Sequence, residues 1–154
     1  FIDKKLSQIG FKIADSAFNK VCNVTEGHTF VISAYMASAY NKLQPAEKEL
    51  TEAHFEAADV EFVSRVLSPF FSRFYDQAGK RSKNILFKMS LNKAGESSLS
   101  ELSEYLKKGS NELSPFLAKL VQDGAIIRIE RGKYRLFHHL LGEYIRGKNE
   151  SNPN

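Results

Sequence analysis

Hydrophobic residues recur at helical spacing through the first half of the chain. Glycines or the Gln44-Pro45 pair follow most of the apolar segments and indicate where the helices end. Thr51 is a suitable N-cap for the segment that continues into the longest predicted helix, over residues 57–75. The predicted helices cover residues 1–9, 15–25, 29–43 and 57–75.

The helix over 57–75 has apolar positions every three or four residues, which predicts one buried stripe. Its members are Val60, Val63, Leu67, Phe70 and Phe74. Pro69 lacks a backbone donor, so a kink or break is expected near Ser68.

The second half predicts helix, helix, turn, helix and β-hairpin in that order. Ser98 with Glu101 forms a capping box, and Ser100 is an equally good N-cap for the second helix. Gly124 ends the third helix. The expected ranges are 84–93, from 98 or 100 to the turn at 109–111, 112–123, a hairpin over 125–137 and a last helix over 138–146. This order predicts a winged helix-turn-helix domain over residues 82–146.

The hairpin is predicted to turn at Arg131-Gly132, which fixes its register. Glu130 is then expected opposite Lys133, Ile129 opposite Tyr134, Arg128 opposite Arg135, and Ile127 opposite Leu136. One face would be apolar and the other charged, because opposed residues share a face. Two arginines in one pair are unfavourable without an anion, so the charged face is the strongest predicted phosphate contact.

The charge of the chain is unevenly distributed. Residues 1–78 carry 8 Lys and Arg against 10 Asp and Glu, a net −2, whereas residues 79–154 carry 14 against 8, a net +6. A basic excess confined to one half indicates a polyanionic partner for that half.

Several other classes of chemistry find little support in the sequence. Its single cysteine, Cys22, is expected on an apolar helical face with Phe18 and Val21, as a structural thiol in a reducing cytoplasm. Four histidines without paired ligand spacing give no zinc motif, so no metal site is predicted. No apolar run approaches the ~18–20 residues of a membrane span.

The predicted fold is mainly α with a small β-hairpin. It is organised as a helical, lid-like domain over 1–78, a winged helix-turn-helix domain over 79–147 and a disordered tail over 148–154.

Several stretches of the chain together resemble one protein family. They are Ile9-Gly-Phe, Thr25-Glu-Gly-His-Thr-Phe, Leu99-Ser-Glu-Leu, Leu117-Ala-Lys-Leu-Val-Gln-Asp-Gly-Ala-Ile, Arg131-Gly-Lys-Tyr-Arg-Leu and Leu141-Gly-Glu-Tyr-Ile-Arg. Together they resemble the helical lid and C-terminal winged helix of archaeal-type P-loop ATPases of the AAA+/STAND group. The resemblance implies nucleotide contact at Gly27, His28 and Thr29, where Thr29 replaces the usual proline of the family.

The resemblance also implies partners and cofactors outside this chain. ATP and Mg²⁺ would belong to an ATPase core preceding Phe1, and no cofactor is expected in the chain itself. The expected partners are duplex DNA, that core and, in a homo-oligomer, a second copy.

Two functions are compatible with these observations. The first is a winged helix that binds duplex DNA mainly through phosphates. Its expected contacts are Lys107, Lys108, Asn111, Ser114, Lys119, Arg128, Arg131, Lys133 and Arg135. The second is a protein-interaction or autoinhibitory winged helix that docks on the ATPase core or on another subunit. The low cation content of helix 112–123 favours the second function, and the +6 charge favours the first.

We predict that this chain alone hydrolyses no ATP. A phosphate-binding loop ends in Gly-Lys-Ser or Gly-Lys-Thr, whereas the Gly-Lys pairs at 79–80, 132–133 and 147–148 are followed by Arg, Tyr and Asn. A phosphate-release assay should give the rate of the buffer blank. Turnover that survives repurification of the chain would contradict the prediction.

Overall fold

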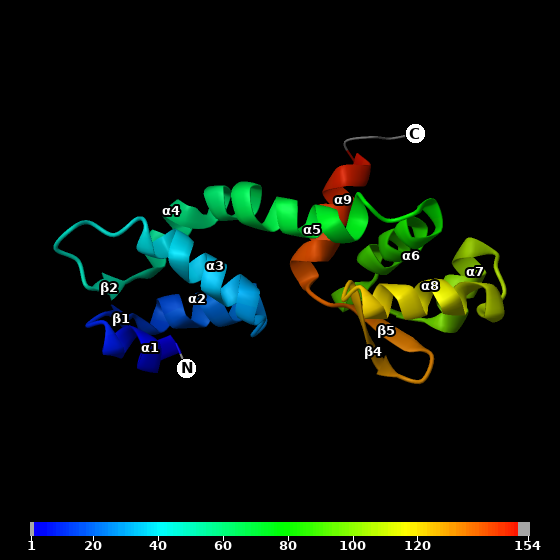
Figure 1. Cartoon of the computed structure of the whole chain (residues 1–154), viewed down its shortest axis with the longest axis horizontal. Helices are drawn as coiled ribbons and strands as arrows, with labels where there is room; N and C mark the ends of the chain where they lie inside the picture. Colours follow the sequence, from blue (N-terminus) through cyan, green and yellow to red (C-terminus); the bar gives the residue numbers. More distant parts are fainter. Residues whose placement is uncertain (1, 151–154) are drawn as a thin grey trace. The chain divides into compact units, whose positions relative to one another are not determined.

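The computed structural model describes residues 2–150, which are mainly helical with two small β-sheets. The chain divides into two compact units between Pro69 and Phe70 (Figure 1). Each unit is described by itself below.

Unit 1, which ends at Pro69, is built from helices close to those predicted. They are α1 (Ile2–Gln8), α2 (Asp15–Thr25), α3 (Thr29–Tyr40) and α4 (Glu52–Phe62), followed by a π-helical segment, η1 (Val63–Leu67). Thr51 is the N-cap of α4, and its backbone N–H donates to Nδ1 of His54 at 3.0 Å. Two short parallel strands, β1 (Lys12–Ile13) and β2 (Glu49–Leu50), were not predicted.

The core of unit 1 surrounds Tyr35 of α3. Its ring is fully buried, with ring centroids 4.8 Å from Phe55 and 4.6 Å from Phe62 of α4. The hydroxyl donates to Asp59, whose other carboxylate oxygen pairs with Lys20 at 3.0 Å. Burial, with the Asp59 carboxylate as a second cause, raises the pKa of Tyr35 above its usual value. Two polar contacts of Asp59 thus join α2, α3 and α4 beside the aromatic core.

Only Leu67 of the predicted stripe is buried, and Phe70 and Phe74 are half-buried. Val60 is 82% exposed and Val63 is also exposed. The buried positions are Phe55, Ala58, Phe62 and Leu67. The five-residue step from Phe62 to Leu67 coincides with the π-helical segment, whose hydrogen bonds span five residues instead of four. The predicted irregularity exists, but it precedes Ser68, where α-helical structure resumes.

Unit 2 contains the predicted succession of helices and hairpin. Its elements are α5 (Ser68–Tyr75), α6 (Lys80–Leu91), the 3₁₀ turn η2 (Lys93–Gly95), β3 (Glu96–Ser98), α7 (Leu99–Leu106), α8 (Ser110–Gln122), β4 (Ile126–Glu130), β5 (Lys133–Leu136) and α9 (His139–Glu150). The strands form an antiparallel sheet in the order β3-β5-β4, although β3 was not predicted. Within the predicted tail over 148–154, residues 148–150 belong to α9, and 151–154 lie outside the described residues.

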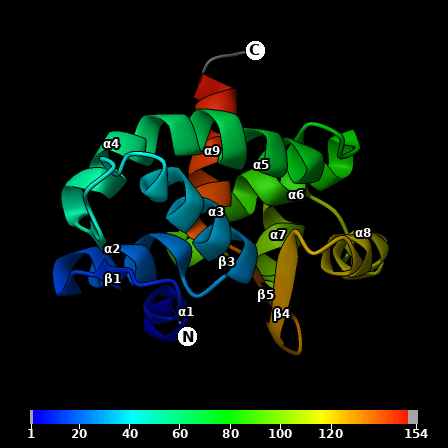
Figure 2. The same ribbon diagram turned by 60° about the vertical axis from the view of Figure 1, so that its left-hand side comes forward.

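The core of unit 2 is apolar and comes mainly from α6, α7 and α8, which lie around the hairpin in Figure 2. Its fully buried members include Ile85, Leu86, Met89, Leu102, Leu113 and Leu117. Three other large apolar residues of these helices are exposed, namely Leu91, Tyr105 and Val121. Each lies beside the buried stripe of its helix, where spacing alone separates core from rim poorly.

Aromatic packing attaches α5 to unit 2. Phe74 lies 5.1 Å from Phe137, between ring centroids, and Phe71 lies 5.9 Å from Tyr144. Asn149 of α9 donates to the Tyr75 hydroxyl at 2.8 Å. The division predicted between residues 78 and 79 therefore lies inside unit 2, at the N-cap of α6.

We predict that Gly95→Ala destabilises the fold much more than Gly132→Ala. Both glycines have positive φ, +67° and +75°, so alanine costs about 1–2 kcal/mol at either position. A Cβ on Gly95 would also lie 3.0 Å from three side-chain carbons of Leu136, whereas one on Gly132 would meet nothing within 4 Å. Overpacking adds about 1–3 kcal/mol at Gly95 alone. Urea unfolding of the full chain followed by circular dichroism measures the difference, and equal losses would contradict the packing argument.

Candidate nucleic-acid interface

The hairpin β4–β5 has a different register from the predicted one. Glu130 lies opposite Lys133 as expected, but a bulge follows on β4 between Arg128 and Glu130. Beyond the bulge the partners are Arg128 with Tyr134, Ile127 with Arg135, and Ile126 with Leu136. The bulge leaves Ile129 without a partner, which shifts every later pair by one residue.

This shift overturns the predicted division into an apolar and a charged face. Ile126 and Leu136 are the buried pair, while Ile127 is 43% exposed and Ile129 is 46% exposed. Arg128 shares a face with Tyr134, and Arg135 lies on the opposite face with Ile127. The predicted pair of opposed arginines does not exist, so its repulsion gives no argument for an anion.

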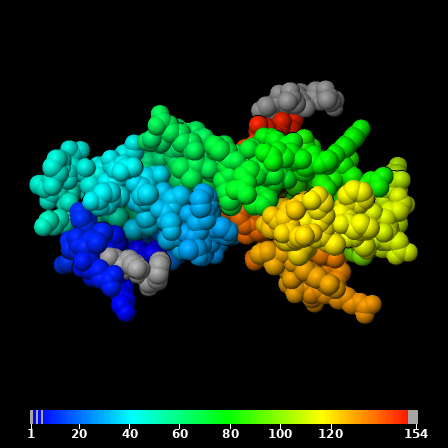
Figure 3. Space-filling view, in the orientation of Figure 1, coloured from blue at the N-terminus to red at the C-terminus, as the bar shows by residue number. Residues whose placement is uncertain are grey.

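The structure instead brings Arg128 next to α8. A groove of about 770 Å³ runs between α8 and the hairpin, whose surfaces adjoin in Figure 3. Helix α8 contributes one wall through residues spaced three and four apart, and the hairpin contributes the other. The lining residues are Leu99, Ser114, Ala118, Val121, Arg128, Arg131, Gly132 and Tyr134.

The groove is electropositive. It is lined by two arginines and no acidic side chain. Neither Arg128 nor Arg131 has an ion-pair partner within residues 2–150. Ser114 and Tyr134 add hydroxyl groups, and the Ser114 hydroxyl donates to the Ser110 carbonyl at 2.8 Å. Two guanidinium groups beside hydroxyls and small apolar side chains suit a phosphodiester backbone.

Local contacts hold the turn of the hairpin against α7. The Leu99 N–H donates to the Gly132 carbonyl at 2.7 Å. Ser98, the first of the two predicted N-caps, begins α7 and forms the capping box with Glu101. The Ser98 N–H donates to Glu101 at 2.6 Å, and this bond holds the pKa of that carboxyl below its usual value. The start of α7 therefore fixes the position of Arg131 next to Gly132.

The other predicted DNA contacts are dispersed. Lys107 caps the C-terminus of α7 in a left-handed conformation, and Asn111 is in the first turn of α8. Three lysines are in salt bridges: Lys108 with Glu112 at 3.4 Å, Lys119 with Asp123 at 3.2 Å, and Lys133 with Glu96 at 3.6 Å. Only Ser114, Arg128 and Arg131 of the predicted set line the groove. Leu99, Val121 and Tyr134 line it too, but no pattern in the sequence assigns them to it.

The predicted sites in unit 1 lie at the ends of helices. Gly27 has a φ of +77° between α2 and α3, His28 is the N-cap of α3, and Thr29 begins that helix with an exposed side chain. Cys22 is exposed on α2, contrary to its expected place on the apolar face. The buried side of α2 is formed by Ala17, Val21 and Thr25, so only Val21 of the predicted apolar face is in the core.

The comparison with curated proteins and the comparison with solved structures both gave no match. No helix within residues 2–150 is both long and apolar enough to cross a bilayer. The model of the family described as "Domain of unknown function (DUF8462)" matches residues 68–145. These residues begin with α5 and extend into α9, so the family domain corresponds to unit 2 with the start of α5 included. Because the match covers half of the 154 residues, the protein is a member of the DUF8462 family.

Proposed function

We propose that unit 2 is a winged helix-turn-helix domain that binds duplex DNA. In this proposal α7 and α8 form the helix-turn-helix, β4–β5 forms the wing, and one DNA strand passes through the groove between α8 and the wing. Arg128 and Arg131 bind its phosphates. Helix α8 faces the adjacent major groove with small side chains, so base readout is limited.

The groove is the observation that carries this proposal. It collects two unpaired arginines where the lining holds no acid, on the side of the hairpin that faces α8. The net +6 of residues 79–154 provides the long-range attraction that a polyanion requires. Lys107 and Asn111, at the turn before α8 and in its first turn, are additional phosphate contacts in this proposal.

A second function, docking of the wing on a protein partner, is favoured by a different observation. Ile127 and Ile129 are exposed on the hairpin, and the single cation of α8, Lys119, is held by Asp123. If the resemblance to P-loop ATPases holds, this partner is the nucleotide-binding core or another subunit. The two functions use opposite faces of the hairpin, because Ile127 shares the face of Arg135 and not that of Arg128.

We predict salt-sensitive binding of the full chain to duplex DNA. Neutralising four to six phosphates gives a slope of log affinity against log salt of about −4 to −5. Fluorescence anisotropy of a labelled duplex over a range of salt concentrations measures this slope. A flat dependence, or no binding at low salt, would contradict the DNA-binding proposal and favour protein docking.

We further predict that Arg128→Ala with Arg131→Ala reduces the salt slope by roughly two, one for each lost phosphate contact. The matched control is Lys133→Ala with Arg135→Ala, which removes the same charge from the hairpin. Arg135 is on the face away from α8, and Lys133 is paired with Glu96, so the control should keep the slope within about half a unit.

Both double variants should remain folded, because none of the four side chains is in the core. Circular dichroism checks the fold before binding is measured. An equal loss of salt slope in the two variants would show that net charge alone attracts DNA and that the groove is not the DNA-binding site.

A further inference from the structure

Helix α6 carries an excess of positive charge on the surface of unit 2. Its sequence contains no acidic residue but four cations, namely Lys80, Arg81, Lys83 and Lys88. None of the four forms an ion pair with an acid within residues 2–150. Asp76 before the helix and Asp123 of the neighbouring α8 segment are already paired, with Lys148 at 3.4 Å and with Lys119 at 3.2 Å. The charge of α6 is therefore available to an external anion.

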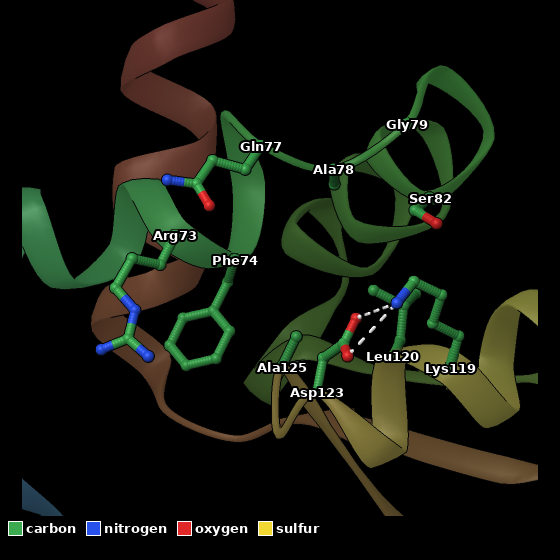
Figure 4. A pocket seen from close by; sticks show the side chains of 10 residues that line it. All are labelled: Arg73, Phe74, Gln77, Ala78, Gly79, Ser82, Lys119, Leu120, Asp123 and Ala125. Atoms are coloured by element: carbon green, nitrogen blue, oxygen red, sulfur yellow. Dashed lines mark hydrogen bonds and ion pairs between the residues drawn. The ribbon is translucent and has the colours of Figure 1, made fainter.

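Packing places Arg81 beside α8. The central carbon of its guanidinium lies 4.9 Å from the ring centroid of Phe116, which is a cation–π contact. Figure 4 shows the same neighbourhood of the two helices, where Gly79 and Ser82 of α6 and Lys119 of α8 line one pocket. Arg81 is exposed, as is Lys80 before it. Cations in the first turn oppose the helix dipole, so these two charges do not serve to stabilise α6.

The start of α6 and the hairpin lie on different sides of α8. Successive residues of a helix are about 100° apart, so Phe116 is about 200° from both Ser114 and Ala118, which line the groove. Between these two sides α8 presents an exposed arc that includes Pro115 and Gln122. In Figure 3 the yellow surface of α8 lies between the orange hairpin and the green surface of α5 and α6. Cations thus flank the exposed arc of α8 on both sides.

The width of α8 matches the separation of the two strands of a duplex. A helix with its side chains is about 10–12 Å across, and the major groove of B-DNA is about 12 Å wide. With α8 in the major groove, the strand on one side passes the hairpin, where Arg128 and Arg131 lie. The strand on the other side then passes the start of α6, where it meets Lys80 and Arg81.

We propose that Lys80 and Arg81 bind the phosphates of the second DNA strand, so that α8 is held in the major groove from both sides. This inference rests on the proposed binding of DNA by unit 2, and it extends the contact from the groove to α6. Phosphate contacts position a protein without reading sequence. The cations of α6 therefore add affinity and fix the orientation of α8 on the duplex.

The test compares a duplex of about ten base pairs, one helical turn, with one of its single strands. Fluorescence anisotropy of the full chain gives the salt slope for each. Lys80→Gln with Arg81→Gln should reduce the duplex slope by about two and leave the single-strand slope within about half a unit. The reason is that only a duplex places a strand on each side of α8. Arg128→Ala with Arg131→Ala should reduce both slopes.

Two further variants separate position from charge and from folding. Arg81→Lys keeps the charge and should keep the slope of the parent, and Lys133→Ala with Arg135→Ala again removes two charges elsewhere in unit 2. Circular dichroism checks that each variant is folded. If the α6 double variant is not, Lys80→Gln alone takes its place, with an expected loss of about one unit of duplex slope.

The results distinguish this inference from the proposed function. If the parent chain binds no duplex, both fail together. If the groove variant lowers the duplex slope and the α6 variant does not, DNA binding at the groove stands and the contact of α6 alone is overturned. Equal losses of the α6 variant on duplex and single strand would also overturn it, because the cations would then serve one strand. A loss no larger than that of the Lys133 and Arg135 control would show an effect of net charge only and would overturn it as well.

Discussion

The burial of Leu136 is the constraint on which the geometry of unit 2 depends. A Cβ on Gly95 would lie 3.0 Å from its side chain, and one on Gly142 would lie 3.2 Å from it, so two glycines provide the space that it fills. With Leu136 inward, alternation along β5 places Tyr134 on the same face and Arg135 on the other. Pairing with β4 then brings Arg128 to the face of Tyr134, beside α8. The position of a groove arginine thus follows from a close contact farther along the same face of the sheet.

The sequence predicts the helices and their caps well because these signals are local. Residues 15–25 form α2 as predicted, and Ser98 with Glu101 caps α7. The register of the hairpin is not local. Ile126 and Ile127 are equally apolar, so periodicity could not decide which of them pairs with Leu136, and an unpaired Ile129 is visible only in the folded sheet. The short strand β3 depends on β5 in the same way, since its three residues carry no strand pattern of their own.

The helical run from α4 to α5 shows how a local signal can mislead. An ideal α-helical period places Val60 and Val63 on the stripe, but the π-helical segment changes the spacing at that point, and Val60 becomes exposed. The domain boundary was predicted between residues 78 and 79, in a polar and basic stretch of the chain. The aromatic residues of α5, which pack on Phe137 and Tyr144, place the division earlier. Composition reports where the chain is polar, whereas packing decides which helix belongs to which core.

Helix α8 contributes to two concave surfaces with different faces. Ser114, Ala118 and Val121 face the groove, while Lys119 and Asp123 line a pocket of about 380 Å³ on another side of the helix. The only lysine of α8 is therefore directed away from the groove, and Asp123 pairs with it at 3.2 Å. The cations for a DNA strand in the groove must for this reason come from the hairpin, so the register of the hairpin decides whether Arg128 is available to bind it.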